Sequence, residues 1–439
     1  MKNQCLLFLL SMSIFWSSCN AAPIKTSLLI KIPTRSRPER LFKTLDAYYA
    51  HLSQEVSVLF VISCDTDDES MNNPEVISRL NRYENLVYNF HPNTSKIEAF
   101  NRDLELYDFE MVIGAQDDSL PAIRGFDRII VDTMHHHFPD LDGVLNLFDG
   151  HIGAECNTLP VIGRKFFDRF GYYYHPAYKA LVCDVEITNV SKMLRKEHIV
   201  SELIIKHNHP AWGGTEHDAL YLKNEQYHRI DVETFVQRRA MLYDLSVQEL
   251  DDAATKMWSI LMYAEPEKRE ALDALYQKLH QQIEELNLQH EIEMLTYVSS
   301  AEEKISQSRI QNNLMYQSSG KYIQFLYAGD DVDDTFIKRI YEKMQKNADC
   351  ICLNGTITFD GKNPKKVIHS RQFESYFEKN GVYCRPPNPL NPIKRWIAIQ
   401  FPFYEGLEFV DLDWAKRIAE SRLIRTEEWI DAPYYFFNH

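Results

Sequence analysis

Two pairs of adjacent aspartates stand out in this sequence as candidates for metal chemistry. Asp117 and Asp118 follow one apolar stretch that predicts a buried strand, and Asp330 and Asp331 follow another. Neighbouring carboxylates repel one another, and a divalent cation offsets that repulsion. Oxygen ligands suit Mg²⁺ or Mn²⁺, which can bind a diphosphate and neutralise a leaving group. A solvated turn or a helix cap is the alternative, but the repetition favours a metal site.

The elements that would position the first pair alternate between strands and helices. Residues 27–32 and 56–63 predict strands, and the second is apolar enough to be buried on both faces of a parallel sheet. Residues 38–51 predict a helix, because apolar residues recur there at spacings of three and four. A further strand at 109–115 leads into Asp117. This order predicts an α/β fold, in which ligands bind beyond the carboxyl ends of the strands.

The same order of elements begins again in the second half of the chain. Residues 246–256 are polar and acidic and predict a linker. After it we expect a strand, a long helix and two further strands at 259–263, 267–288, 291–298 and 322–327. The sequence therefore predicts an internal duplication of about 200 residues per copy, with domains at 23–245 and 257–439.

Composition and charge exclude several classes of protein. The chain has 439 residues with 45% hydrophobic and 25% charged residues, an ordinary globular mix that excludes a disordered chain or a fibre. The net charge is −15. A phosphate backbone repels so acidic a chain, so we expect no nucleic-acid partner.

The N-terminus has the pattern of a secretory signal peptide. Lys2 precedes an apolar run that is too short to span a bilayer, and small residues follow it up to Ala22. We predict a signal peptide at 1–22, and therefore an exported or membrane-associated protein. Lipidation at Cys19 and an uncleaved anchor are alternatives, and the protein would be cytoplasmic if the leader is not used. No later segment predicts a transmembrane span.

Three motifs resemble inverting, family-2-like glycosyltransferases with the GT-A fold. The segment LLIKIPTRSRPERLFKTL at 28–45 is similar to the opening of that family, with a Pro-Thr-x-x-Arg-Pro turn. VISCDTDD at 61–68 resembles the segment whose Asp meets the nucleotide, and residues 96–121 resemble the helix and the DxD-type metal strand. The resemblance implies donor contacts from Pro33, Thr34, Arg35, Arg37, Asp65 and Asp117, and a metal ligand at Asp118.

Later segments of the first half are similar to the acceptor side of such domains. The family places an acidic catalytic base, often as Glu-Asp, near the start of a helix. Asp184 fits this position best, although Cys183 departs from the pattern and Glu186 stays possible. Some GT-A enzymes use a late histidine as a further metal ligand, which implies His209 here; a histidine bonded in a loop is the alternative.

The second half resembles the same family across about 257–437, with larger departures. The resemblance gives Asp331 as the metal ligand and Asp411 at the position of the base. The Pro-Thr turn is replaced, and Ser299 and Ser300 stand where an aspartate is expected. We therefore predict that the first half binds the donor better, and that the second is a weak transferase or a docking domain for the acceptor.

The implied fold is two tandem GT-A-like, Rossmann-like, nucleotide-diphospho-sugar transferase domains. The implied activity is a metal-dependent, inverting transfer of the hexosyltransferase type. The cofactor would be Mn²⁺ or Mg²⁺, the donor a nucleotide-diphosphate sugar, and the acceptor a glycan, lipid or protein. A nucleotidyltransferase is disfavoured, because the turn after the first strand has no glycine. A catalytically inactive sugar- or protein-binding module derived from the fold is the alternative that an export signal favours.

Overall fold

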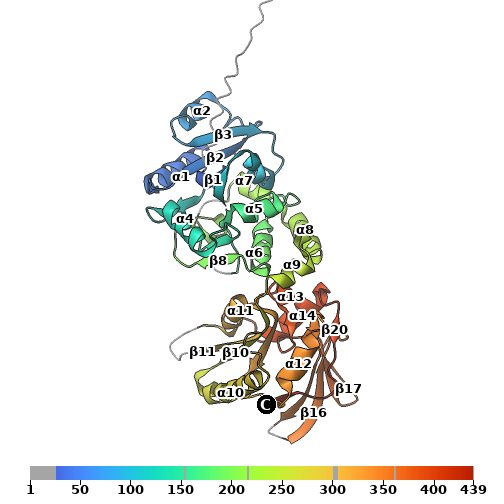
Figure 1. Ribbon diagram of the computed structural model, residues 1–439. Helices are drawn as coiled ribbons and strands as arrows, with labels where there is room; N and C mark the ends of the chain where they lie inside the picture. Colours follow the sequence, from blue (N-terminus) through green and yellow to red (C-terminus); the bar gives the residue numbers. More distant parts are fainter. Residues whose placement is uncertain (1–25, 153–154, 215–216, 300–304, 360–361, 439) are drawn as a thin grey trace, which may run out of the picture.

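The computed structural model describes residues 26–152, 155–214, 217–299, 305–359 and 362–438. The predicted signal peptide and Ser300 lie outside these ranges. The chain forms two bodies, with the N-terminal half in one and the C-terminal half in the other (Figure 1). Within the described ranges, every helix is too short or too polar to cross a membrane.

The N-terminal half is built on one mixed sheet. In the described residues this sheet has seven strands in the order β3-β2-β1-β4-β7-β6-β8. The first four in that order are parallel, β7 is antiparallel to both of its neighbours, and β6 is parallel to β8. Its strands are β1 (Thr26–Pro33), β2 (Val58–Asp65), β3 (Leu86–His91), β4 (Phe109–Gly114), β6 (Val144–Leu147), β7 (Pro160–Gly163) and β8 (Glu197–Val200). A separate two-stranded sheet joins β5 (Ser119–Pro121) to β9 (Ile205–His207).

Helices connect these strands as the hydrophobic pattern predicts. Helix α1 (Pro38–His51) occupies the predicted range, because Pro38 suits the first helical turn and Leu41, Leu45 and Tyr48 pack into the core. The other helices are α2 (Pro74–Leu80), α3 (Lys96–Asn101), α4 (Phe126–His137), α5 (Arg164–Phe170), α6 (Cys183–Met193), α7 (Ala219–Glu225) and α8 (His228–Ala240). The α/β fold class is thereby confirmed.

The C-terminal half has a central sheet of matching strand order. In the described residues its six strands run β11-β10-β12-β19-β14-β20. This order can be aligned with β2-β1-β4-β7-β6-β8 of the N-terminal sheet. Each neighbouring pair that is parallel in one sheet is then parallel in the other, and each antiparallel pair is antiparallel in both. The strands are β10 (Lys256–Ala264), β11 (Ile292–Val298), β12 (Gly320–Tyr327), β14 (Cys350–Ile351), β19 (Ile393–Lys394) and β20 (Glu427–Glu428). The edge strand β3 is the one that has no counterpart among the described strands.

A second sheet and five helices complete this half in the described residues. The sheet has the order β13-β21-β15-β16-β18-β17. Its strands are β13 (Asp331–Val332), β15 (Leu353–Phe359), β16 (Lys362–His369), β17 (Phe377–Lys379), β18 (Val382–Arg385) and β21 (Tyr435–Asn438). The helices are α10 (Arg269–Glu285), α11 (Gln307–Gln317), α12 (Phe336–Met344), α13 (Arg395–Ala398) and α14 (Val410–Ser421).

The predicted linker is part of the folded structure. Residues 247–252 form helix α9 (Val247–Asp252), which Ser246 caps, and β10 already begins at Lys256. The Asp251 carboxylate is buried and forms ion pairs with Lys394 at 3.1 Å and Lys321 at 3.0 Å. The acidic residues of this segment take part in the cap of α9 and in ion pairs with Lys321 and Lys394, so the segment predicted as a linker is ordered.

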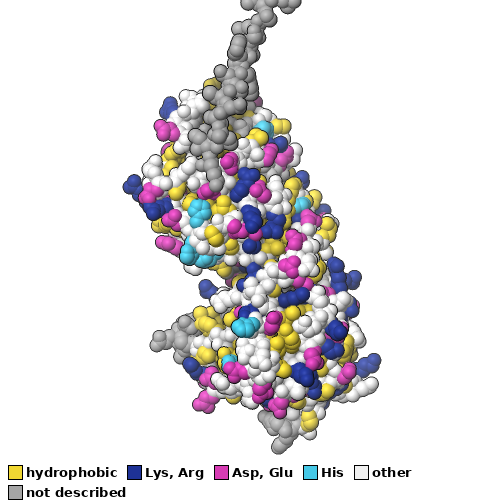
Figure 2. Space-filling model, in the orientation of Figure 1, with side chains coloured by type: hydrophobic (Ala, Val, Ile, Leu, Met, Phe, Trp, Pro, Cys, Tyr) yellow, Lys and Arg dark blue, Asp and Glu magenta, His cyan; other side chains and the backbone are white. Residues whose placement is uncertain are grey.

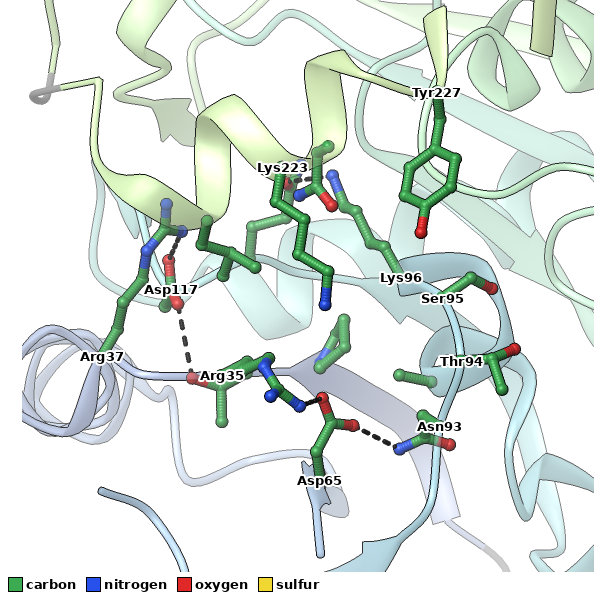
Figure 3. Close-up of a pocket in the computed structure, with 16 residues that line it drawn as sticks. Arg35, Arg37, Asp65, Asn93, Thr94, Ser95, Lys96, Asp117, Lys223 and Tyr227 are labelled. Carbon is green, nitrogen blue, oxygen red and sulfur yellow. Dashed lines mark hydrogen bonds and ion pairs between the residues drawn. The ribbon is translucent and has the colours of Figure 1, made fainter. Parts of the chain in front are cut away.

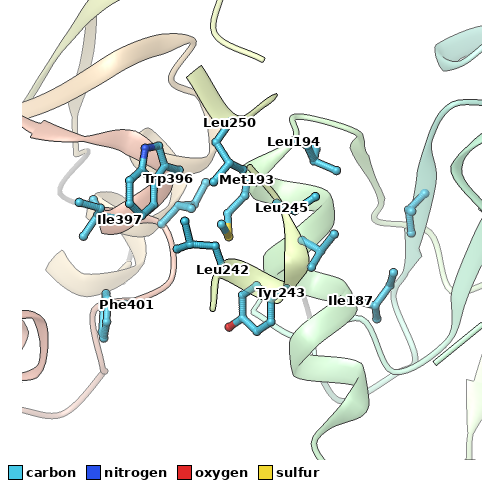
Figure 4. Packing of buried hydrophobic residues seen from close by; sticks show 14 of the residues in the cluster. Ile187, Met193, Leu194, Leu242, Tyr243, Leu245, Leu250, Trp396, Ile397 and Phe401 are labelled. Atoms are coloured by element: carbon cyan, nitrogen blue, oxygen red, sulfur yellow. The ribbon is translucent and has the colours of Figure 1, made fainter. Parts of the chain in front are cut away.

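The two halves share one apolar core. Met193 and Leu194 at the end of α6 belong to the same buried cluster as Leu250, Trp396 and Ile397 (Figure 4).

Arg395 crosses the boundary between the halves. Its guanidinium donates to the carbonyl of Lys192 at 2.9 Å and to the Ser318 hydroxyl at 3.1 Å. Burial lowers the pKa of Arg395 to about 9. Apolar packing and the hydrogen bond to Lys192 therefore fix the halves to one another.

Removing the indole of Trp396 should test this boundary. We expect Trp396→Ala to lower the free energy of unfolding by about 3–5 kcal/mol, because the side chain is 5% exposed and its loss leaves a cavity. Urea titration followed by circular dichroism measures it. Trp212 is 52% exposed, so Trp212→Ala should cost less than about 1 kcal/mol. Equal losses in the two variants would contradict the shared core.

Candidate active site

A cleft of about 690 Å³ opens at the carboxyl ends of β1, β2 and β4. Its walls come from the turn after β1, the end of β2, the segment that precedes α3 and helix α7 (Figure 3). Its lining includes Pro33, Thr34, Arg35, Arg37, Asp65, Asn93, Lys96, Gln116, Asp117, Lys223 and Tyr227. This is the place where a sheet of this kind binds ligands, and we call it the N-terminal cleft.

The charge of the N-terminal cleft suits an anion. Its described lining carries four basic side chains and two acidic ones. Lys96 donates a hydrogen bond to the Gln116 side chain at 2.7 Å. The Lys223 ammonium points into the cleft from α7 (Figure 3). A phosphate group could therefore meet several donors from two sides.

Asp65 is held in the wall of the N-terminal cleft. Its carboxylate accepts hydrogen bonds from Arg35 at 2.6 Å and from the Asn93 amide at 2.9 Å. Arg35 also pairs with Asp67 at 2.6 Å. The structure thus brings the predicted nucleotide contact to the cleft and fixes its orientation.

Asp117 lies at the end of β4 and holds the turn after β1. It accepts hydrogen bonds from Arg37 at 2.9 Å and from the Thr34 hydroxyl at 3.3 Å. Burial raises the pKa of Asp117 to about 6; Arg37 opposes this effect and the Asp118 carboxylate adds to it. Arg37 also forms a two-pronged pair with Asp218, with distances of 2.7 and 2.6 Å. These three residues therefore satisfy one another inside the protein.

Asp118 and His207 form a buried pair next to this cleft. Strand β5 pairs with β9 so that Ser119 lies opposite His207, which brings the imidazole to the neighbouring Asp118. Oδ1 of Asp118 and Nε2 of His207 are 3.2 Å apart. Neither of these two atoms has a partner in hydrogen-bond geometry within the described structure. Burial raises the pKa of Asp118, but the contact with His207 and the charge of nearby basic groups that include Lys96 together outweigh this effect, and the pKa is lowered.

The predicted metal ligand His209 is engaged elsewhere. Its Nδ1 accepts a hydrogen bond from the backbone N–H of Ala211 at 3.2 Å. Burial, followed by repulsion from His207, lowers the pKa of His209 to about 4, so the ring is neutral at pH 7. A neutral imidazole that accepts at Nδ1 carries its proton on Nε2 and cannot ligate a metal there. The geometry therefore favours His207 over His209.

A cation beside Asp118 would need ligand atoms from a bound substrate in addition to those of the protein. Within the described ranges, no group of three or more His, Cys, Asp or Glu side chains could hold a metal ion. Asp118 and His207 offer one oxygen and one nitrogen, a donor set that suits Mn²⁺ or Mg²⁺ when further oxygens come from a bound diphosphate.

Asp184 lies in the first turn of α6, as predicted for the base. Its carboxylate accepts a hydrogen bond from the backbone N–H of Val185 at 2.9 Å. Burial raises the pKa of Asp184, which that hydrogen bond and the charge of Lys96 partly oppose. Lys96 also acts electrostatically on Asp118. Both carboxylates are thus within the electrostatic range of Lys96.

Glu186 belongs to a buried hydrogen-bond network that joins two helices. It is buried, and its carboxylate accepts hydrogen bonds from Arg238 at 2.7–2.9 Å and from the Tyr178 hydroxyl at 2.7 Å. Such a carboxylate is fully engaged and holds α6 against α8. The structure therefore favours Asp184 over Glu186 as the base.

Breaking this buried pair should destabilise the fold. We expect Arg238→Met to lower the free energy of unfolding by about 3–5 kcal/mol, because Glu186 would keep a buried charge without its partner. Arg229 is an exposed arginine of the same helix, so Arg229→Met should change stability by less than about 1 kcal/mol. Denaturant unfolding measures the free energy of unfolding of both variants. A decrease of less than about 1 kcal/mol for Arg238→Met would refute the structural role of the Arg238–Glu186 pair.

The C-terminal half places its predicted residues differently. Asp331 is exposed at the start of β13 and pairs with Lys278 at 2.8 Å. Because β13 pairs with β21 as β5 pairs with β9, the counterpart of Asp118 is Asp330, which accepts a hydrogen bond from the Tyr435 hydroxyl at 2.6 Å. Asp330, and not the predicted Asp331, therefore occupies the position that corresponds to Asp118.

Asp411 lies in the first turn of α14, in the same relation to its helix as Asp184 to α6. It accepts hydrogen bonds from Tyr327 and from Gln311, the latter at 3.0 Å. Burial raises the pKa of Asp411. Asp411 lines a cleft together with Asp330.

Several site residues escaped the sequence analysis. Lys96 follows β3 at the same sheet edge as Asp65, so its position after a strand was a usable signal. Lys223 on α7 and Tyr227, just before α8, reach the N-terminal cleft from a segment that is distant in sequence, and no local pattern indicates this.

Comparisons with known proteins find similarity in structure alone. No protein-family model matches the sequence, and no curated protein is similar to it at a significant level. The mannosyltransferase PcManGT from Pyrobaculum calidifontis, in complex with GDP-Man and Mn²⁺, aligns with a TM-score of 0.33 and 13% identity over 41% of this chain and 55% of its own. TarS 1–349 of S. aureus aligns with a TM-score of 0.30 and 10% identity over 42% of this chain and 60% of its own. Its complex with UDP-GlcNAc gives 0.28 and 10% over 42% and 59%.

These alignments span between half and two thirds of the solved structures. They are too distant to assign a function, so the functional argument rests on the residues of the N-terminal cleft.

Proposed function

We propose that this chain is a metal-dependent glycosyltransferase that moves a sugar from a nucleotide-diphosphate sugar to an acceptor hydroxyl with inversion. One observation carries the proposal. Lys96 lines a cleft with net positive charge, and it acts electrostatically both on Asp118, which together with His207 has unused ligand atoms, and on the helix-start carboxylate of Asp184. A diphosphate, its cation and an acceptor hydroxyl need these three kinds of group.

The roles of the residues follow from their chemistry. Asp118 and His207 would hold Mn²⁺ or Mg²⁺, which supplies positive charge against the leaving diphosphate. Lys96 and Lys223 bind the phosphates, and Asp65 orients the nucleoside.

Asp184 accepts the proton of the acceptor hydroxyl as that oxygen attacks the anomeric carbon. The bond from this carbon to the diphosphate oxygen breaks with its electron pair going to the phosphate. A single displacement of this kind inverts the anomeric configuration.

We further propose that the two halves are tandem copies with different tasks. The matching strand order of the two central sheets supports a duplication. The N-terminal cleft has basic side chains for a diphosphate, whereas the C-terminal half lacks the turn of Pro33 and Thr34 in its sequence. Donor binding would therefore belong to the first half.

Turnover of a donor panel tests the proposal. The full chain is incubated with UDP-, GDP- and CDP-sugars and Mn²⁺, and release of the nucleoside diphosphate is measured by chromatography. We expect release from at least one donor. The alternative is an inactive sugar- or protein-binding module, which the internal pairing of Arg35 and Arg37 favours. Binding of a sugar without any release would support that alternative and refute the transferase.

The cellular location stays a proposal. If residues 1–22 act as a signal peptide, the reaction takes place outside the cytoplasm or at a membrane.

A further inference from the structure

The C-terminal half contains a second and larger cleft. It has a volume of about 1200 Å³ and lies between the end of β12, the starts of α11 and α14, and the second sheet. Its lining includes Tyr327, Asp330, Tyr376, Arg385, Phe409 and Asp411. We call it the C-terminal cleft; it is large enough for a small-molecule ligand.

The charge of the C-terminal cleft is opposite to that of the N-terminal cleft. Its described lining has one basic side chain, Arg385, and three acidic ones, Asp330, Glu408 and Asp411. A diphosphate would meet net negative charge there. The cleft therefore disfavours a nucleotide sugar and admits an uncharged ligand.

Two exposed aromatic side chains line the C-terminal cleft. Phe409 is 64% exposed and Tyr376 is 38% exposed. The Arg385 guanidinium lies over the Tyr376 ring, 5.5 Å from its centre. Exposed aromatic rings beside polar groups are suited to bind a ligand face that carries C–H groups, because this contact removes the apolar area of the ring from water.

Fixed hydrogen-bond acceptors lie deeper in the C-terminal cleft. The Asp411 carboxylate is oriented by Tyr327 and Gln311, and the Asp330 carboxylate by Tyr435. Each carboxylate oxygen has two lone pairs, so these carboxylates can also accept hydrogen bonds from two hydroxyl groups of a ligand. Arg385 can donate to the ring or hydroxyl oxygens of the same ligand.

We propose that the C-terminal cleft binds an uncharged saccharide, which stacks on Phe409 and Tyr376 and donates its hydroxyls to Asp411 and Asp330. A saccharide is the ligand class that has both an apolar ring face and adjacent hydroxyl donors. This inference does not depend on the transferase proposal, because binding here needs no nucleotide and no metal.

The test uses the full chain and neutral sugars without nucleotide or metal. The probes are the methyl glycosides of glucose, galactose, mannose and N-acetylglucosamine, and an array of neutral oligosaccharides. Calorimetry then measures the affinity of each probe that binds. We expect millimolar or tighter binding of at least one probe. Phe409→Ala should weaken it about tenfold, the loss of one stacking contact of roughly 1.4 kcal/mol, and Asp411→Asn should weaken it as well.

Phe377 provides the matched control. It is 42% exposed and adjoins Tyr376 in sequence but does not line the C-terminal cleft, so Phe377→Ala should bind like the wild type. Asp184→Asn should also retain saccharide binding, which separates this inference from the transferase proposal.

The inference would be overturned by no binding of any neutral probe, by binding that Phe409→Ala and Asp411→Asn leave unchanged, or by binding of UDP or GDP with Mn²⁺ that these two substitutions remove. Choline serves as a cationic probe, and preferential binding of choline in the same cleft would equally exclude a saccharide site.

Discussion

Replacement of Asp184 by asparagine should lower kcat by about 10²–10⁴ and leave the affinity for the donor nearly unchanged. Asparagine has the same shape but cannot accept the proton of the acceptor hydroxyl. The hydrogen bond from the Val185 N–H can persist to the amide oxygen, so the start of α6 should stay in place. Steady-state kinetics and donor titration of the same preparation measure both quantities.

Glu186→Gln is the control for this substitution. Glu186 is two residues away on the same helix but pairs with Arg238, so its loss should appear in stability rather than in the chemical step. A Glu186→Gln variant that folds like the wild type and loses activity, beside an active Asp184→Asn, would move the base by two residues.

The pH dependence of kcat should carry the signature of Asp184. The base acts in its deprotonated form, and burial raises its pKa above that of an ordinary aspartate. As the pH falls, kcat should therefore decline at a higher pH than a solvated aspartate would give. A kcat that stays constant down to the ordinary range of an aspartate would exclude Asp184 from proton transfer.

Replacement of Asp118 by asparagine should weaken Mn²⁺-dependent donor binding by about 10²-fold or more while the fold persists. The buried Asp118–His207 pair supplies the only described carboxylate beside the N-terminal cleft with an unused buried oxygen. Calorimetry of donor binding with and without Mn²⁺ measures the effect. We expect the wild type to gain affinity from Mn²⁺ and the variant to gain none.

Three substitutions sharpen this test. His207→Gln should reduce the gain from Mn²⁺, whereas His209→Gln should leave most of it, because His209 is held by Ala211. Asp331→Asn lies on the exposed surface of the other half and should have no effect. Unchanged affinity in Asp118→Asn would exclude this residue as the metal ligand.

The sequence predicted the elements of the sheet better than the details of the site. Strands that are apolar on both faces and helix α1 follow from local patterns, so their positions were predictable. The choice between Asp330 and Asp331 depends on the register of β13 with β21, which joins segments about a hundred residues apart. The sequence of two adjacent aspartates does not indicate which of them faces the cleft.

The choice between His207 and His209 has a similar cause. Two histidines separated by one residue look equivalent in a loop. Pairing of β5 with β9 brings the first to Asp118, and the turn at Ala211 occupies the second. Glu186 likewise looked available, because its partner Arg238 lies on a helix more than fifty residues away.

The most direct test of the account is the position of the metal. Crystals of the full chain soaked with Mn²⁺ and UDP or GDP should show an anomalous difference peak beside Oδ1 of Asp118 and Nε2 of His207, with the diphosphate in the N-terminal cleft near Lys96 and Lys223. A peak beside Asp330 in the C-terminal cleft, or a bound nucleotide without any metal at Asp118, would contradict it.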